Sequence, residues 1–186
     1  MRTGAFRYLF FSFLLLLTDV TFGGFDWTPD LVGAAILLLG LRELRAFDAE
    51  CTAGFGKTIL WGWVLLALGA GRVALYFLPD AGWLLPWLCA FSSLAAAVAV
   101  WLCGAGVFRL AVQVGQHSLA AALRQSVFAA CICCLSAACS RVLSAGFGAE
   151  PAPFSSVVIT AASVAAAFWF CALLLRAQKL LRPFFG

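Results

Sequence analysis

Long apolar runs separated by short polar breaks occupy almost the whole of this chain of 186 residues. Hydrophobic residues make up 65% of the sequence and charged residues 11%, whereas soluble domains are about 45–50% apolar and about 25% charged. The polar surface that a soluble fold requires is therefore missing. The length suits one compact bundle, so the sequence predicts a single transmembrane domain over residues 1–186.

The apolar residues form six segments, at about 6–25, 31–47, 58–78, 83–107, 119–146 and 154–175. A spanning helix needs about 20 residues. The second segment is short, because only Leu31–Leu41 is free of charge, and the others are long enough. We therefore expect an all-α integral membrane protein, a six-helix transmembrane bundle built as three helical hairpins.

The basic residues sort to one side of this predicted topology. With the N-terminus in the cytoplasm, ten of the 12 lysines and arginines fall on the inner side. The other two, Arg72 and Arg141, lie inside apolar segments. Cytoplasmic loops of membrane proteins carry the excess of lysine and arginine. The pattern therefore predicts six spans with both termini in the cytoplasm.

Four charged residues, Asp19, Asp30, Arg72 and Arg141, lie inside or at the edge of apolar runs. At about 1.5 Å rise per residue, all four fall in the outer half of the membrane if the inner bases mark one plane. Opposite charges at similar depth should pair, since each is costly alone in a low dielectric. We expect Asp19 and Asp30 to contact Arg72 and Arg141, in a cluster that also includes Asp26.

The helical phase of the arginines indicates that they face other helices. Arg72 shares a predicted helix face with Gly69, and Arg141 shares one with Cys134, Ala137 and Ala138. Small residues mark helix–helix contacts in membranes, because they let backbones approach. The arginines are therefore expected to point into the bundle.

The sharpest local motif is Asp26-x-x-Pro29-Asp30-x-x-Gly33. Proline suits the first helical position, and an acid suits the positive end of the helix dipole, so ordinary helix-start chemistry accounts for the motif. A functional interpretation stays open, because three aspartates gather around Gly23-Gly24, a natural break in the first segment.

Other residue types carry little functional signal. The eight cysteines fall mostly in apolar segments and are interpreted as packing residues, and there is a single histidine, His117. Serines and threonines such as Ser92, Ser93, Thr160 and Ser163 can bond to their own helix or to a neighbour. The motifs typical of nucleophilic or zinc catalysis do not occur. We therefore expect no cofactor, no metal and no enzymatic activity, and the dispersed charge of +4 predicts no nucleic-acid partner.

The first third of the chain resembles a group of small bacterial multi-pass membrane proteins of unknown function. Their mark is an apolar first helix, the aspartate–proline turn described above, and a short second helix that ends in Gly-Leu and bases, here Gly40-Leu41-Arg42-Glu43-Leu44-Arg45. The resemblance implies a bacterial plasma membrane location. It implies no substrate, cofactor or mechanism.

Two hypotheses for function follow from the charge cluster. The first is a non-enzymatic bundle whose Asp–Arg pairs fix the helix register, alone in the lipid bilayer, as a homo-oligomer or in a membrane complex. The alternative is a small transporter or channel-like protein that uses the cluster as an ion, proton or anion site, since intramembrane charges commonly mark such sites. A dry, fully paired cluster would exclude the alternative.

Overall fold

The computed structural model describes residues 4–18, 21–22, 25–26, 30–45, 52–75, 77–78, 83–147 and 153–181. Most of these residues form helices, and two short segments form a β pairing. The helices are α1 (Ala5–Leu17), α2 (Asp30–Arg45), α3 (Thr52–Leu75), α4 (Leu85–Gln113), α5 (His117–Phe147) and α6 (Pro153–Leu181). Strands β1 (Thr21–Phe22) and β2 (Phe25–Asp26) pair antiparallel, with Thr21 opposite Asp26.

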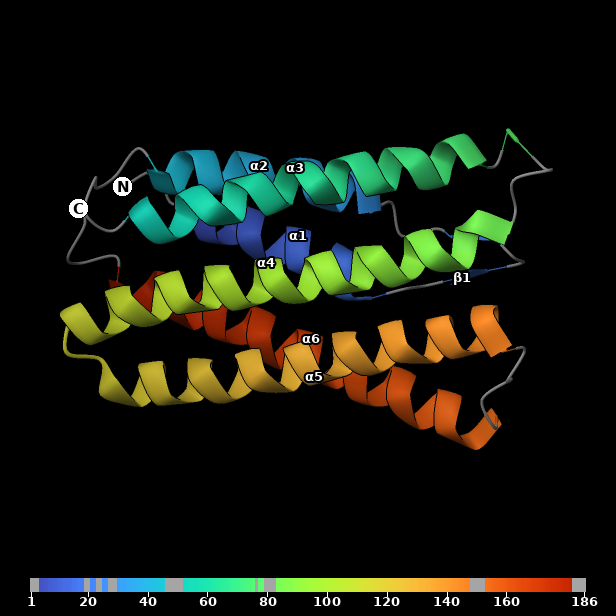
Figure 1. The fold of residues 1–186 in the computed structure, drawn as a ribbon. Helices are drawn as coiled ribbons and strands as arrows, with labels where there is room; N and C mark the ends of the chain where they lie inside the picture. The colour runs from blue at the N-terminus through green and yellow to red at the C-terminus, as the bar shows by residue number, and fades with distance from the viewer. Residues whose placement is uncertain are drawn as a thin grey trace.

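The six helices lie side by side along one direction (Figure 1). Each helix packs against the next in the sequence, and α6 packs against α1, so the helices close into a ring. We call one end of this bundle the basal end: α1 begins there, α6 ends there, and residues 114–116 join α4 to α5. The β1–β2 pair lies toward the opposite end (Figure 1).

Four helices are long and apolar enough to cross a membrane, over Phe55–Leu75, Leu85–Gln113, His117–Gly146 and Val157–Leu181. The fold is thus a helical, apolar bundle compatible with a membrane protein. Three of these helices run further than the apolar segments do: α3 starts at Thr52, and α4 and α6 continue to Gln113 and Leu181. The extensions carry bases near the basal end, where a helix can leave the hydrocarbon and continue among polar groups.

The first helix differs most from the prediction. A helix over about 6–25 was expected, but α1 ends at Leu17, where the Thr18 hydroxyl and backbone N–H both donate to the Leu14 carbonyl. The chain then turns to extended backbone at β1 and β2. With 13 residues, α1 spans about 20 Å at about 1.5 Å per residue, less than a hydrocarbon core of about 30 Å.

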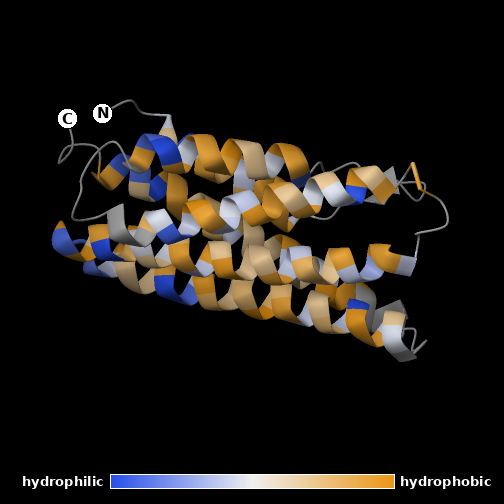
Figure 2. Ribbon diagram, turned by 45° about the horizontal axis from the view of Figure 1, so that its top comes forward, coloured by the Kyte–Doolittle hydropathy of each residue, from blue (hydrophilic) through white to orange (hydrophobic). Residues whose placement is uncertain are grey.

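The basal half of the bundle holds a filled apolar core. Phe6, Leu9 and Phe13 of α1 are buried there with Val107 of α4 and Phe170 of α6. The Phe13 and Phe170 rings meet edge to face, with centroids 5.3 Å apart. Figure 2 shows polar residues gathered at this end and apolar residues along the middle of the helices.

Candidate functional site

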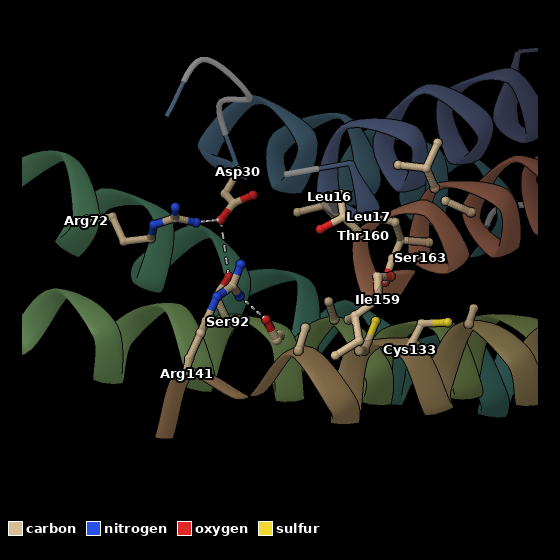
Figure 3. Close-up of a pocket in the computed structure, with 17 residues that line it drawn as sticks. Leu16, Leu17, Asp30, Arg72, Ser92, Cys133, Arg141, Ile159, Thr160 and Ser163 are labelled. Atoms are coloured by element: carbon tan, nitrogen blue, oxygen red, sulfur yellow. Dashed lines mark hydrogen bonds and ion pairs between the residues drawn. The ribbon is translucent and has the colours of Figure 1, made fainter. Parts of the chain in front are cut away.

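An ion pair joins α2 to α3 at the end of the bundle opposite the basal end. Asp30, the first residue of α2, accepts from Arg72 Nη1 in the last turn of α3 through its Oδ2 atom. The two side chains are only 12% and 11% exposed. This contact is one of those that the sequence predicts, and Figure 3 shows the two side chains facing each other.

Gly69 allows this ion pair to form. A Cβ atom at Gly69 would lie 2.9 Å from the Leu31 backbone nitrogen, closer than real Cβ contacts come. The start of α2 therefore rests directly on the backbone of α3, one helical turn before Arg72. Sequence phase placed Gly69 and Arg72 on one face, and the close approach explains why that face meets Asp30.

A third helix joins the pair through Ser92 of α4, whose hydroxyl donates to Asp30 Oδ2 at 3.3 Å. Asp30 also lies at the N-terminal end of α2, where unpaired backbone N–H groups favour negative charge. A guanidinium, a hydroxyl and a helix terminus therefore all stabilise the same carboxylate.

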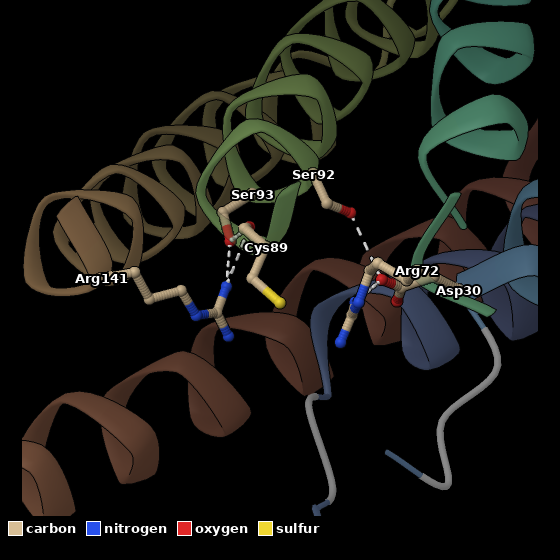
Figure 4. A network of polar contacts seen from close by, with 6 residues as sticks. All are labelled: Asp30, Arg72, Cys89, Ser92, Ser93 and Arg141. Carbon is tan, nitrogen blue, oxygen red and sulfur yellow. Dashed lines mark hydrogen bonds and ion pairs between the residues drawn. The ribbon is translucent and has the colours of Figure 1, made fainter. Parts of the chain in front are cut away.

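Arg141 reaches from α5 toward α4, as Figure 4 shows. Its Nη1 atom donates to Ser93 Oγ and to the Cys89 carbonyl, the latter at 3.2 Å. The Ser93 hydroxyl in turn donates to the Cys89 carbonyl at 3.1 Å. Two adjacent serines on α4 thus bind the two charged groups. Ser92 donates a hydrogen bond to the Asp30–Arg72 pair, and Ser93 accepts one from the Arg141 guanidinium.

These groups line a cavity of about 330 Å³ in the middle of the ring. All six helices contribute to its wall, and Leu16 and Leu17 at the end of α1 are part of it. Its polar lining, drawn in part in Figure 3, consists of side chains that carry charge, hydroxyl or thiol: Asp30, Arg72, Ser92, Ser93, Cys133, Cys134, Arg141, Thr160 and Ser163.

The predicted cluster is thus assembled in part. Asp30, Arg72 and Arg141 line one cavity. Asp19 lies outside the described residues. The backbone of Asp26 is part of β2, and the structure does not describe its side chain.

Sequence reasoning gave too little weight to the hydroxyl residues. Ser93, Thr160 and Ser163 line the cavity, although no particular role was predicted for them. The available signal was position: Ser92 and Ser93 stand near the outer end of their helix, at the depth of the charges. Among the described residues, no group of three or more histidine, cysteine or acidic side chains is arranged to hold a metal ion.

Comparison with protein-family models, with curated proteins and with solved structures finds no match to this chain. The functional signal of this chain therefore lies in the cavity and in the residues that line it.

Proposed function

We propose that this chain is a membrane-spanning helical bundle that binds a small ion or polar solute in its central cavity, as a small transporter or channel-like protein. The observation that carries this proposal is the cavity, whose wall combines a carboxylate, two guanidinium groups and several hydroxyls. Its volume of about 330 Å³ lies at the lower end of the range for small-molecule sites, about 300–1,000 Å³.

Charge in the outer part of a bundle is costly unless it is paired or used. If the Asp30–Arg72 pair served only to hold two helices together, the bundle could bury it among packed side chains. Here the pair forms part of a cavity wall together with Arg141. That arrangement supports a binding role in addition to a structural one.

The proposal includes a location and an orientation. The basal end would face the cytoplasm of a bacterial cell, since Arg7, Arg42, Arg109 and Arg124 lie on the parts of their helices nearest to it. The resemblance of the first third of the chain to small bacterial membrane proteins agrees with a plasma membrane home. The activity would be non-enzymatic, with the bilayer as the immediate partner.

Flux in proteoliposomes tests the function. Vesicles would contain the purified protein and either a proton-sensitive or a chloride-sensitive dye, and the corresponding gradient would be applied. We expect protein-dependent flux of one of the two ions, and we expect Asp30→Asn to abolish it while the protein stays folded. Glu43→Gln, the same change elsewhere on α2, is the matched control and should leave the flux intact.

The second candidate is a purely structural bundle, alone or as a subunit of a complex. The hydrogen-bonded set of Asp30, Arg72 and Ser92 favours it, because that set ties α2, α3 and α4 together. Absence of both ion fluxes, together with a loss of stability in Asp30→Asn, would favour this candidate and count against transport.

A further inference from the structure

A second hollow region lies between α4 and α5, toward the basal end. It consists of two adjoining hollows of about 800 Å³ and 360 Å³, which share Phe108, Arg124 and Phe128. The larger one reaches Val112 and His117 beside the α4–α5 turn, and the smaller one reaches Trp101. We call the two together the α4–α5 groove.

The part of this groove that is farther from the basal end is apolar and lies on the surface of the bundle. Trp101 and Phe128 are 47% and 46% exposed, and their rings meet edge to face with centroids 5.4 Å apart. Gly104 and Ala105 line the same hollow. From Val112 to Trp101 the groove runs for about 16 Å at about 1.5 Å per residue, a length suited to part of an acyl chain.

The part of the groove that is nearer to the basal end carries positive charge. Arg124 is exposed, and among the described residues that line the groove it is the formally charged one, while no carboxylate lies among them. His117 and Gln125 add polar hydrogen-bonding groups nearby. Arg124 stands about 10 Å along α5 from His117, the first residue of the helix, where an arginine can extend its head group to the membrane interface.

We propose that the α4–α5 groove binds an anionic phospholipid. The phosphate would lie against Arg124, with His117 and Gln125 beside it, and one acyl chain would run past Phe108 to Trp101 and Phe128. Charge complementarity selects this occupant, because basic pockets between membrane helices bind anionic head groups and the rest of the groove is apolar. The proposal does not depend on what the central cavity binds.

Native mass spectrometry of the purified protein tests this proposal. The protein would be equilibrated in detergent with equal amounts of phosphatidylglycerol and phosphatidylcholine that carry identical acyl chains. We expect the wild type to retain phosphatidylglycerol over phosphatidylcholine by about fivefold, the preference that one basic residue near the membrane surface confers. Arg124→Gln should remove the preference.

Arg109→Gln is the matched control, since Arg109 is an exposed arginine of α4 near the same turn and lines neither hollow. It should keep the preference. Ala105→Phe should fill the smaller hollow and lower the retention of both lipids, which also tests the site if Arg124→Gln does not fold. A wild type without preference, an equal loss in both arginine variants, or unchanged retention in Ala105→Phe would overturn the proposal.

Discussion

At the scale of single residues, Asp30 lies where two sources of positive potential meet, the N-terminal end of α2 and the Arg72 guanidinium. An acid at a helix start gains a favourable interaction with the dipole, and in a buried ion pair each charge offsets part of the desolvation cost of the other. Removing one partner leaves the other charge uncompensated, which costs about 3–5 kcal/mol in buried pairs. Asp30 and Arg72 should therefore be coupled energetically.

A double-mutant cycle measures this coupling. We expect Asp30→Ala and Arg72→Ala each to lower the free energy of unfolding by about 3 kcal/mol. The double variant should lose less than the sum, by a coupling energy of about 1–3 kcal/mol. Denaturant titration in mixed micelles gives these free energies.

The control cycle pairs Arg72→Ala with Glu43→Ala. Glu43 lies near the other end of α2, and distant sites add within about 0.5 kcal/mol. Additive losses in the Asp30–Arg72 cycle as well would contradict a stabilising ion pair.

The residue types and spacing were enough to predict that Asp19 and Asp30 meet Arg72 and Arg141, but they left open which acid pairs with which arginine. A carboxylate at a helix start and an arginine beside a glycine were visible in the sequence, and burial in lipid requires opposite charges to find each other. The hydroxyl contact between Ser93 and Arg141 could not be predicted in the same way. A serine in a helix can satisfy itself on its own backbone, so its presence does not identify a partner.

At the scale of helices, Gly69 fixes how closely α2 and α3 approach. A Cβ atom there would meet the backbone of Leu31, which cannot move aside as a flexible side chain can. We expect Gly69→Ala to push the start of α2 away from α3 and to lower the free energy of unfolding by about 1–3 kcal/mol, as overpacking does.

Gly71→Ala is the control for this helix. Its Cβ would lie 3.7 Å from the nearest atom outside its own helix, Leu88 Cδ1, which is an ordinary contact. Alanine is favoured over glycine within a helix by about 1 kcal/mol, so this variant should be neutral or more stable. Thermal unfolding of both variants in one detergent gives the comparison, and equal effects would contradict the close approach at Gly69.

The early end of α1 shows where hydropathy stops being informative. The first apolar segment was drawn past Leu17 to Phe25, although Asp19 interrupts it, so it predicts a helix that is longer than the one found. The competing signal is local: Thr18, Val20 and Thr21 are β-branched and favour extended backbone, and Gly23-Gly24 permits a turn. Hydropathy reports that a segment is apolar, but it does not report the backbone preferences of the residues within it.

At the scale of the whole molecule, the two halves of the bundle differ. The basal half is packed around Phe13 and Phe170, whereas the other half surrounds the polar cavity. Leu17 lines the cavity one helical turn beyond Phe13, so the Phe13–Phe170 contact lies just below it. Water and solutes should therefore reach the cavity from the end of the bundle opposite the basal end.

Labelling of single cysteines tests this access. In a variant whose native cysteines are replaced by alanine, Ala137→Cys places a thiol in the cavity wall. A membrane-impermeant maleimide should modify it in proteoliposomes when the reagent is added on the side away from the basal end. The mass shift of the intact protein gives the extent of labelling.

Leu135→Cys is the control, because Leu135 lies near the same depth of α5 but is 47% exposed on the outside of the bundle. A thiol in hydrocarbon does not ionise, and the thiolate is the reactive form, so this position should stay unmodified. Equal labelling at both positions, or labelling of Ala137→Cys from the basal side alone, would contradict access from the far end.

The position of the cavity, in the half of the bundle away from the basal end, has an electrical consequence. If the cavity fills with water, that half of the protein conducts and the membrane voltage falls mainly across the packed basal half. A potential that normally drops over about 30 Å would then drop over roughly half that distance. Moving one elementary charge across the whole potential still costs or releases about 2.3 kcal/mol for each 100 mV. A charge moving past Phe13 and Phe170 would experience nearly the whole of that field within a few helical turns, whereas Asp30, Arg72 and Arg141 would experience little of it.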